Sequence, residues 1–308
     1  MLDQTALAKE QLLKSKKVWT NGEVRGKIVV YACAYFMIFA AISIVIFLGF
    51  KGLQSFTKNG VSILEFLTGS TWKPADHSNP QYGAFPFIAG SLAVTLLSAF
   101  IAAPLGIGGA IFMTEIAPSW GKKLLQPVIE LLVGIPSVVY GFIGLTVLVP
   151  FVRWTFGGLG FSLLSGMIVL SIMILPTITS IATDAFESLP NSLREGAYAV
   201  GATRWQTIRS VLIPAALPNL LTAVVLGMAR AFGEALAVQM VIGNVKDLPH
   251  SLLDPSATLT TIITLSMGET TFGSSENNIL WAMGLLLLLI SFIFILLIRY
   301  LSSRRKIS

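Results

Sequence analysis

Hydrophobic residues occur in long runs along this chain, separated by shorter polar stretches. The unbroken apolar runs at 28–50 and 279–300 are each long enough to cross a bilayer as a single helix. Four further apolar segments contain glycines and prolines, which membrane-spanning helices tolerate. The pattern therefore predicts an all-α polytopic membrane protein with six spans, at about 28–50, 85–113, 127–152, 161–183, 215–243 and 279–300.

Composition supports a membrane protein and charge predicts its orientation. Of the 308 residues, 54% are hydrophobic and only 12% are charged, about half the charged share of a soluble domain. With both termini in the cytoplasm, fifteen of the 21 Lys and Arg residues face the cytoplasm and five face the outside. Because basic residues concentrate on the cytoplasmic side, this orientation is favoured. The basic residues behind the net charge of +6 therefore mark the cytoplasmic side and contact the lipid surface. The charge is not a sign of nucleic-acid binding.

The spans and charges divide the chain into segments. We expect a cytoplasmic N-terminal tail, a first span, an extracytoplasmic loop, a core membrane domain with a cytoplasmic polar hairpin, and a cytoplasmic C-terminal tail. These are, in order, residues 1–27, 28–50, 51–84, 85–300 (with the hairpin at 192–214) and 301–308. The outer loops at 51–84 and 244–278 are long enough to dock a solute receptor, although plain lipid-facing cover is the alternative.

The polar hairpin contains residues typical of helix starts and helix ends. Ser192 with Glu195, and Thr203 with Gln206, have the spacing of capping boxes. Gly201 lies between them, where a helix end in the left-handed conformation favours glycine. Pro214 is expected to prevent the second short helix from continuing unbroken. The sequence thus predicts a helix, a glycine corner and a second short helix.

One face of the first hairpin helix is apolar. Leu193, Ala197 and Val200 share that face at helical spacing. A small apolar ridge on a compact hairpin suits insertion into the groove of a partner protein. The alternative is an amphipathic hairpin that lies on lipid without a partner.

Ionisable residues within the fifth predicted span need a reason, because a charge at the centre of a bilayer costs about 2.5–3.5 kcal/mol. Arg230 and Glu234 are four residues apart and are expected to pair on one helix face. Small residues such as Ala223 and Gly227 are predicted near the same face, which favours a substrate pathway. A neutral pair that only fixes helix packing is the alternative.

The third and fourth spans show weaker polar stripes. Glu130 and Ser137 share a face of the third span with two glycines, and Thr177 and Ser180 share a face of the fourth. Together with the fifth span, these stripes indicate a polar seam through the bundle. Arg230 is the fixed positive charge that an anion would meet there, and its planar guanidinium suits a tetrahedral oxyanion.

The hairpin resembles the EAA signature of ABC importer permeases. Glu195, Ala197 and Gly201, followed by Val211-x-Ile213-Pro214, hold the matching positions, with Gly196 in place of the first alanine. The resemblance implies a type I ABC importer permease fold in which the hairpin docks into a cytoplasmic ATPase. The candidate coupling residues are Leu193, Glu195, Ala197, Gly201 and Arg204.

Longer segments resemble the phosphate-importer permeases of the PstC family. They are TGSTWKP, YGAFPFIAGSL, PLGIGGAIFMTE, GIPSVVYGFIGL and RAFGEALAVQMVIGN, and they occur in the family's order between residues 68 and 244. The resemblance implies a PstA-like second permease, a PstB-like ATPase dimer and a PstS-like phosphate-binding protein as partners. It also maps the family's intramembrane Arg and Glu onto Arg230 and Glu234.

The energy source is expected in a partner, because the sequence contains no Gly-x-x-x-x-Gly-Lys-Ser/Thr segment. We therefore expect ATP and Mg²⁺ to bind the partner ATPase, with no cofactor or metal in this chain, which is predicted to be a transport subunit and not an enzyme. Another oxyanion, such as sulfate or molybdate, is the alternative substrate. An ion-coupled secondary transporter is a further alternative, disfavoured by the hairpin.

Overall fold

The computed structural model describes residues 21–74, 76 and 79–303. Residues 1–20 and 304–308, which make up most of the two predicted tails, lie outside the described residues. The chain divides into two compact units, residues 1–50 and residues 51–308. The described part of the first unit is one long helix, which continues into the beginning of the second.

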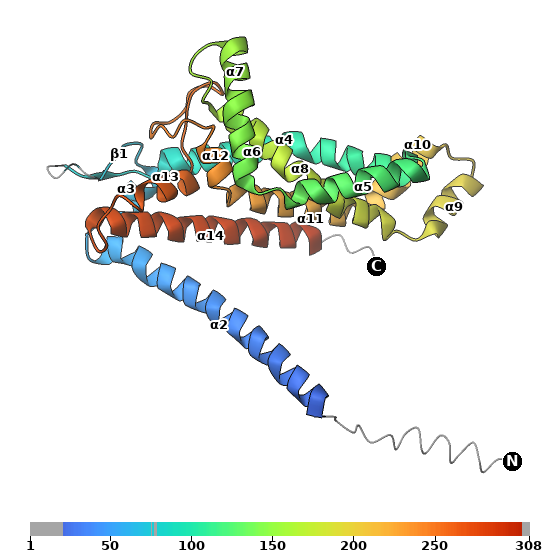
Figure 1. Ribbon diagram of the computed structural model, residues 1–308, viewed down its shortest axis with the longest axis horizontal. Coiled ribbons are helices and arrows are strands. Elements are labelled where there is room, and N and C mark those ends of the chain that lie inside the picture. The colour runs from blue at the N-terminus through green and yellow to red at the C-terminus, as the bar shows by residue number, and fades with distance from the viewer. Residues whose placement is uncertain (1–20, 75, 77–78, 304–308) are drawn as a thin grey trace. The chain divides into compact units, whose positions relative to one another are not determined.

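The described chain is mostly helical and contains one short antiparallel β-hairpin, in which Trp72 pairs with Tyr82 (Figure 1). The α-helices are α2 (Asn21–Thr57), α3 (Ile63–Thr68), α4 (Phe85–Ile111), α5 (Ser119–Gly134), α6 (Ser137–Ile143), α7 (Val149–Phe156), α8 (Leu163–Glu187), α9 (Asn191–Ala199), α10 (Arg204–Thr207), α11 (Ile213–Phe232), α12 (Leu236–Gln239), α13 (Leu259–Ser266) and α14 (Ser275–Ser303). The strands are β1 (Trp72–Lys73) and β2 (Gln81–Tyr82), and three π-helical turns are η1 (Phe112–Ile116), η2 (Gly144–Leu148) and η3 (Ile208–Leu212).

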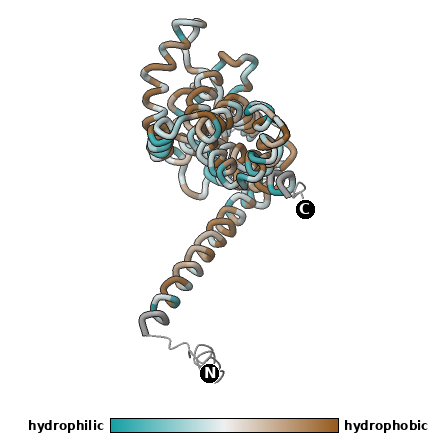
Figure 2. Tube along the Cα trace, turned by 90° about the vertical axis from the view of Figure 1, so that its right-hand side faces the viewer, coloured by the Kyte–Doolittle hydropathy of each residue, from teal (hydrophilic) through white to brown (hydrophobic). Residues whose placement is uncertain are grey.

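Among the described residues, six helical segments are long and apolar enough to span a membrane, which confirms the predicted number. They are Arg25–Thr57, Phe85–Ile116, Ser137–Phe156, Leu163–Glu187, Arg204–Phe232 and Ser275–Leu296. The first has a mean hydropathy of 2.5, so its side chains are suited to contact lipid. Figure 2 shows hydrophobic residues along most of its length.

The third and fifth spans differ from the prediction. The third begins at Ser137, because Pro136 disfavours helical backbone at the residue before it and α5 ends at Gly134. The fifth ends at Phe232 instead of continuing to 243.

Pro214 does not end the helical span, although η3 interrupts the α-helix immediately before it. It lies in the first turn of α11, where its missing N–H and fixed φ are tolerated. The π-helical turn η3 precedes it, so α10, η3 and α11 form one continuous span from Arg204 to Phe232. Single π-helical turns of this kind occur mostly inside longer α-helices.

Helices α4, α8 and α11 form the main hydrophobic core. Two serines join α4 to α8: Ser98 Oγ donates to the Met167 carbonyl at 3.0 Å, and Ser171 Oγ donates to the Ser98 carbonyl at 3.2 Å. Interhelical bonds of this kind contribute about 0.6 kcal/mol each on average. Gly227 packs against α8, since a Cβ there would lie 2.7 Å from Ile178 Cγ1. Gly227 therefore serves close helix packing and not the predicted pathway lining.

The second unit has two distinct ends (Figure 1). The hairpin end contains α9, α10 and residues 112–123, and the loop end contains the β-hairpin, α3, α13 and residues 244–274. A second apolar cluster lies at the loop end, where Trp72 packs edge-on against Phe87 with ring centroids 5.4 Å apart. The helical bundle therefore separates two surfaces that are built from different segments of the chain.

Candidate functional site

Arg230 lies in the last turn of α11, where the negative end of the helix dipole favours a cation. Its Nη1 donates a hydrogen bond to Thr177 Oγ1 on α8 at 2.9 Å. The structure thus brings together two residues that the sequence assigned separately to the polar seam. Their role in a pathway stays a prediction.

Glu234 does not pair with Arg230, contrary to the prediction. Gly233 ends α11, so the two residues are not on one helix and their spacing of four does not align them. Glu234 Oε1 instead accepts a hydrogen bond from the backbone N–H of Ala237, in the first turn of α12, at 3.1 Å. The helix is therefore broken next to Arg230, and no ion pair between Arg230 and Glu234 forms within the described residues.

Glu130 and Ser180 line one polar cavity of about 240 Å³ between α5 and α8. The lining residues are Met113, Gln126, Ile129, Glu130, Ser180, Thr183, Asp184 and Glu187. Gln126 Nε2 donates to Glu130 Oε1 at 3.0 Å. Because three of the lining residues are carboxylates, this cavity repels anions more than it attracts them.

Ser137 lies on a different helix from Glu130, so the predicted face shared by these residues is wrong. The chain bends at Ile135 and Pro136, and Ser137 begins α6. The predicted continuous seam is therefore two separate features. One is the Arg230–Thr177 contact, and the other is the carboxylate-lined cavity with Glu130 and Ser180.

The hairpin has the predicted helix–corner–helix form. Thr203 and Gln206 make both hydrogen bonds of a capping box, at 2.8 and 3.3 Å. Gly201 has φ +79°, the left-handed conformation expected at the corner. The predicted Ser192–Glu195 box is wrong, because α9 begins at Asn191 after Pro190 and Ser192 is already inside the first turn.

The apolar face of α9 packs against the protein itself and does not point outward towards a partner, which is contrary to the prediction. Ala197 is 8% exposed and Leu193 packs against the main core, so both face the protein's own bundle. Val200 is 84% exposed beside Gly201. Tyr198 and Trp205 are also exposed. The apolar surface available to a partner is therefore this corner.

Tyr198 and Trp205 were not among the candidate coupling residues. The sequence feature that could have identified them is a pair of aromatic residues on either side of a glycine within an otherwise polar insert. Glu195 and Arg204 are exposed at the same end, as their predicted role requires.

Arg194 and Glu115 form an ion pair that the sequence did not predict. Arg194 Nη2 lies 2.6 Å from Glu115 Oε1, and Arg194 Nε lies 3.2 and 3.3 Å from the two carboxylate oxygens. The side chains are 20% and 7% exposed. The carboxylate raises the pKa of the guanidinium, which therefore stays charged. The pair connects α9 to η1 at the end of α4.

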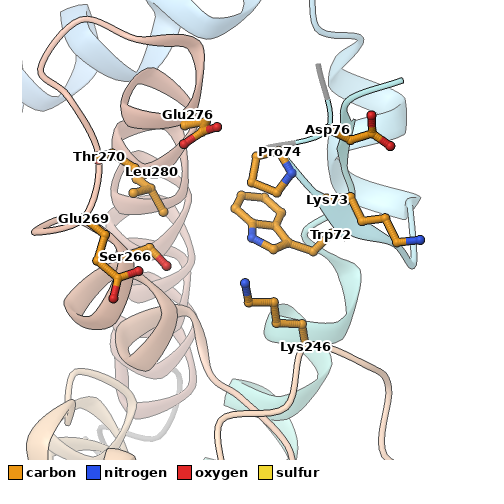
Figure 3. A pocket seen from close by; sticks show the side chains of 10 residues that line it. All are labelled: Trp72, Lys73, Pro74, Asp76, Lys246, Ser266, Glu269, Thr270, Glu276 and Leu280. Carbon is orange, nitrogen blue, oxygen red and sulfur yellow. The ribbon is translucent and has the colours of Figure 1, made fainter. Parts of the chain in front are cut away.

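A second cavity, of about 460 Å³, opens at the loop end (Figure 3). It is lined by Trp72, Lys73, Pro74, Asp76, Lys246, Ser266, Glu269, Thr270, Glu276 and Leu280. The Lys246 ammonium points into the gap towards Trp72, whereas the Lys73 side chain points away. Burial, with a smaller effect of Glu276, raises the pKa of Tyr82 beside this cavity. The cavity presents charges of both signs, so it suits a polar partner.

Comparison with known proteins gives three consistent matches. The family model described as "Binding-protein-dependent transport system inner membrane component" matches residues 106–307. The chain is 71% identical over 299 residues to the probable ABC transporter permease protein YqgH of Bacillus subtilis, covering 97% of this chain and 96% of that protein. It is 34% identical over 319 residues to the phosphate transport system permease protein PstC of Haemophilus influenzae, covering 96% and 98%.

A solved structure gives a similar result for the fold alone. The crystal structure of a bacterial alginate ABC transporter, in complex with an alginate-pentasaccharide-bound periplasmic protein, contains a chain that matches with a TM-score of 0.64. The alignment covers 95% of this chain and 99% of that chain at 16% identity.

Proposed function

This chain belongs to the family of binding-protein-dependent transport system inner membrane components, and we propose that within it the chain is a permease subunit of an ATP-driven importer of inorganic phosphate. The family fixes the coarser part of this statement. The chain is a multi-pass plasma-membrane transport subunit of the ABC importer permease fold, and a separate ATPase hydrolyses the ATP.

The single observation that carries the choice of an anion is the position of Arg230. Its guanidinium lies where the fifth span breaks, held by Thr177 of α8. A planar guanidinium donates two parallel hydrogen bonds to an oxyanion, and a partly desolvated charge acts more strongly than one in water. Breaks in membrane helices near the middle of the bilayer are a common place for substrate sites in transporters.

Phosphate is preferred over other oxyanions because of the named relative PstC, which covers nearly the whole chain. Sulfate or molybdate remains the alternative substrate, since both are tetrahedral oxyanions that would meet the same guanidinium. The Glu130 cavity is then better suited to release an anion than to hold one, because its lining is rich in carboxylates.

The two ends of the bundle have different partners in this proposal. The hairpin end faces the cytoplasm, where the exposed corner at Val200 docks onto a PstB-like ATPase dimer that binds ATP and Mg²⁺. The loop end, with its mixed-charge cavity, receives a PstS-like phosphate-binding protein. A PstA-like second permease completes the pathway.

Uptake by the reconstituted importer tests the proposal. Liposomes containing this chain with its partner permease and ATPase, supplied with the binding protein and internal ATP, should accumulate labelled phosphate. A tenfold excess of sulfate or molybdate should leave this uptake nearly unchanged. Strong competition by sulfate or molybdate would instead assign the importer to that anion.

Two variants test the site itself. Arg230→Gln should reduce uptake at least tenfold, because hydrogen bonds to a charged group contribute about 1.5–3 kcal/mol. Arg153→Gln is the matched control, since Arg153 is an exposed arginine in the last turn of another spanning segment, at α7. Wild-type uptake by Arg230→Gln would make Arg230 a packing residue only.

A further inference from the structure

The side chain of Arg194 connects the hairpin to the rest of the bundle. Glu195, the next residue, is exposed on the surface of α9, whereas Arg194 is largely buried against η1 and α8. Besides its contacts with Glu115, Arg194 Nη2 donates to the Phe186 carbonyl at 3.1 Å and Nη1 donates to the Leu189 carbonyl at 3.3 Å. One guanidinium therefore joins α9 to the ends of both α4 and α8.

These contacts fix the orientation of α9 as well as its distance from the ends of α4 and α8. A guanidinium is a rigid planar fork, so its contacts with a carboxylate and with backbone carbonyls define the orientation of the side chain that carries it. The two helices at the other side of the contact, α4 and α8, are themselves joined by the Ser98 and Ser171 hydrogen bonds. A displacement of α9 is consequently passed to α4 and α8 together.

The remaining attachments of α9 are less directional. Its two ends are turns, at Pro190 and at the left-handed Gly201, and its buried side chains, Leu193 and Ala197, are small or flexible apolar groups. Apolar contacts are not directional, so they allow α9 to roll over the surface beneath it. The ion pair prevents that rotation.

We propose that Glu115 and Arg194 form the positioning contact that transmits movement of the ATPase-docked hairpin to the α4–α8 pair. The inference deepens the proposed function and depends on it for the identity of the transported ion. Neither residue touches the substrate. Their role is to keep α9 fixed to α4 and to α8, the helix that carries Thr177, so that ATPase movement changes the surroundings of Arg230.

A second ion pair at the same end serves as the control. Lys122 and Glu187 join α5 to the end of α8, but their side chains are 39% and 43% exposed. Solvent-exposed pairs contribute little, since water and salt screen them. Removing this pair changes the local charge at the hairpin end without releasing α9.

The experiment places methionines at both residues of the buried pair, and separately at Lys122 of the exposed pair, in the complete reconstituted importer. Replacing a buried ion pair by apolar side chains of similar length leaves no uncompensated charge, so the Glu115→Met/Arg194→Met double variant should insert and retain the ATPase. We expect its basal ATP hydrolysis, measured without the binding protein, to stay within twofold of wild type. Phosphate transported per ATP hydrolysed should fall at least tenfold. The control variant Lys122→Met breaks the exposed pair, leaves Glu187 in the carboxylate-lined cavity, and should keep both quantities within twofold.

Two outcomes overturn the inference. A double variant with the wild-type ratio of phosphate to ATP means that the pair transmits nothing. A double variant that inserts but loses the ATPase means that the pair shapes the docking surface itself. Should the double variant fail to insert, Arg194→Lys decides, because it keeps the charge and loses the fork. Its ratio should lie below wild type, and a wild-type ratio would refute the proposal.

Failure of the proposed function has a different signature. If the wild-type importer moves no phosphate, the substrate assignment is wrong, yet the stimulation of its ATPase by the binding protein still reports coupling. In that case, the double variant should lose this stimulation while the control variant keeps it, and stimulation retained by both would refute the role of the pair.

Discussion

The corner of the hairpin offers a test in which two glycines differ in a single property. Gly201 has φ +79°, and Gly196 lies inside α9 with ordinary helical backbone. A Cβ added at either position would meet no atom within 4 Å. The substitutions Gly201→Ala and Gly196→Ala therefore differ in backbone conformation and not in steric contact.

The expected magnitudes follow from that conformation. An alanine in the left-handed region costs roughly 1–2 kcal/mol. An alanine in place of a helical glycine stabilises by about 0.5–1 kcal/mol. The two variants should thus differ by about 1.5–3 kcal/mol in the stability of the corner, or roughly 10- to 150-fold in its population.

Hydrogen bonds at the end of α9 explain why the corner needs this conformation. The Gly201 N–H donates to the Tyr198 carbonyl at 2.9 Å, and the Ala202 N–H donates to the Ala197 carbonyl at 3.1 Å. This is the Schellman arrangement, which requires a left-handed residue. Losing it would move the exposed side chains on either side of the corner.

The assay is a titration of the purified ATPase onto the permease complex in lipid nanodiscs. Gly201→Ala should weaken ATPase binding about tenfold or more, whereas Gly196→Ala should bind like wild type or slightly better. Equal binding by the two variants would show that the corner's conformation does not control docking, and the reasoning would then be refuted.

Two further predictions concern the pathway and the loop end. Thr177→Val removes the acceptor of Arg230 Nη1, and the loss of about 1.5–3 kcal/mol should reduce phosphate uptake at least tenfold. Thr177→Ser keeps the hydroxyl and should keep the uptake. Equal uptake by the two variants would mean that this hydrogen bond does not position the guanidinium. Burial raises the pKa of Tyr82 above its ordinary value of 10.0, so its contribution to stability is complete below pH 10 and is lost as the pH rises through the raised pKa. Tyr82→Phe should therefore reduce the loss of thermal stability above about pH 10, measured by melting in detergent, and an unchanged pH profile would contradict this.

Several local features of the chain could be predicted because their causes are local. The capping box at Thr203 and Gln206 needs only residues three apart, and the positive φ of Gly201 follows from the absence of a Cβ. The number of spans follows from the length of each apolar run against the thickness of a bilayer. These interactions do not depend on where the rest of the chain lies.

Predictions that assumed an unbroken helix failed where the backbone breaks. The pairing of Arg230 with Glu234 requires continuous helix across Gly233, and the shared face of Glu130 and Ser137 requires it across Pro136. Helical periodicity gives no sign of such breaks, and membrane helices often contain glycine and proline without breaking. Which of these residues interrupts a helix depends on the contacts available to the freed backbone groups, such as the hydrogen bond from the Ala237 N–H to Glu234 Oε1.

The sequence by itself determined that this chain crosses the membrane six times and carries a glycine-cornered polar hairpin, because both depend on residues near one another in the chain. Only the tertiary structure decided which side of α9 faces outward and which partner holds Arg194. Glu115 lies 79 residues from Arg194, and Thr177 lies 53 residues from Arg230. The physical reason is that helix packing selects such pairs, since the packing of α4, α8 and α11 brings these segments together whatever their separation in sequence.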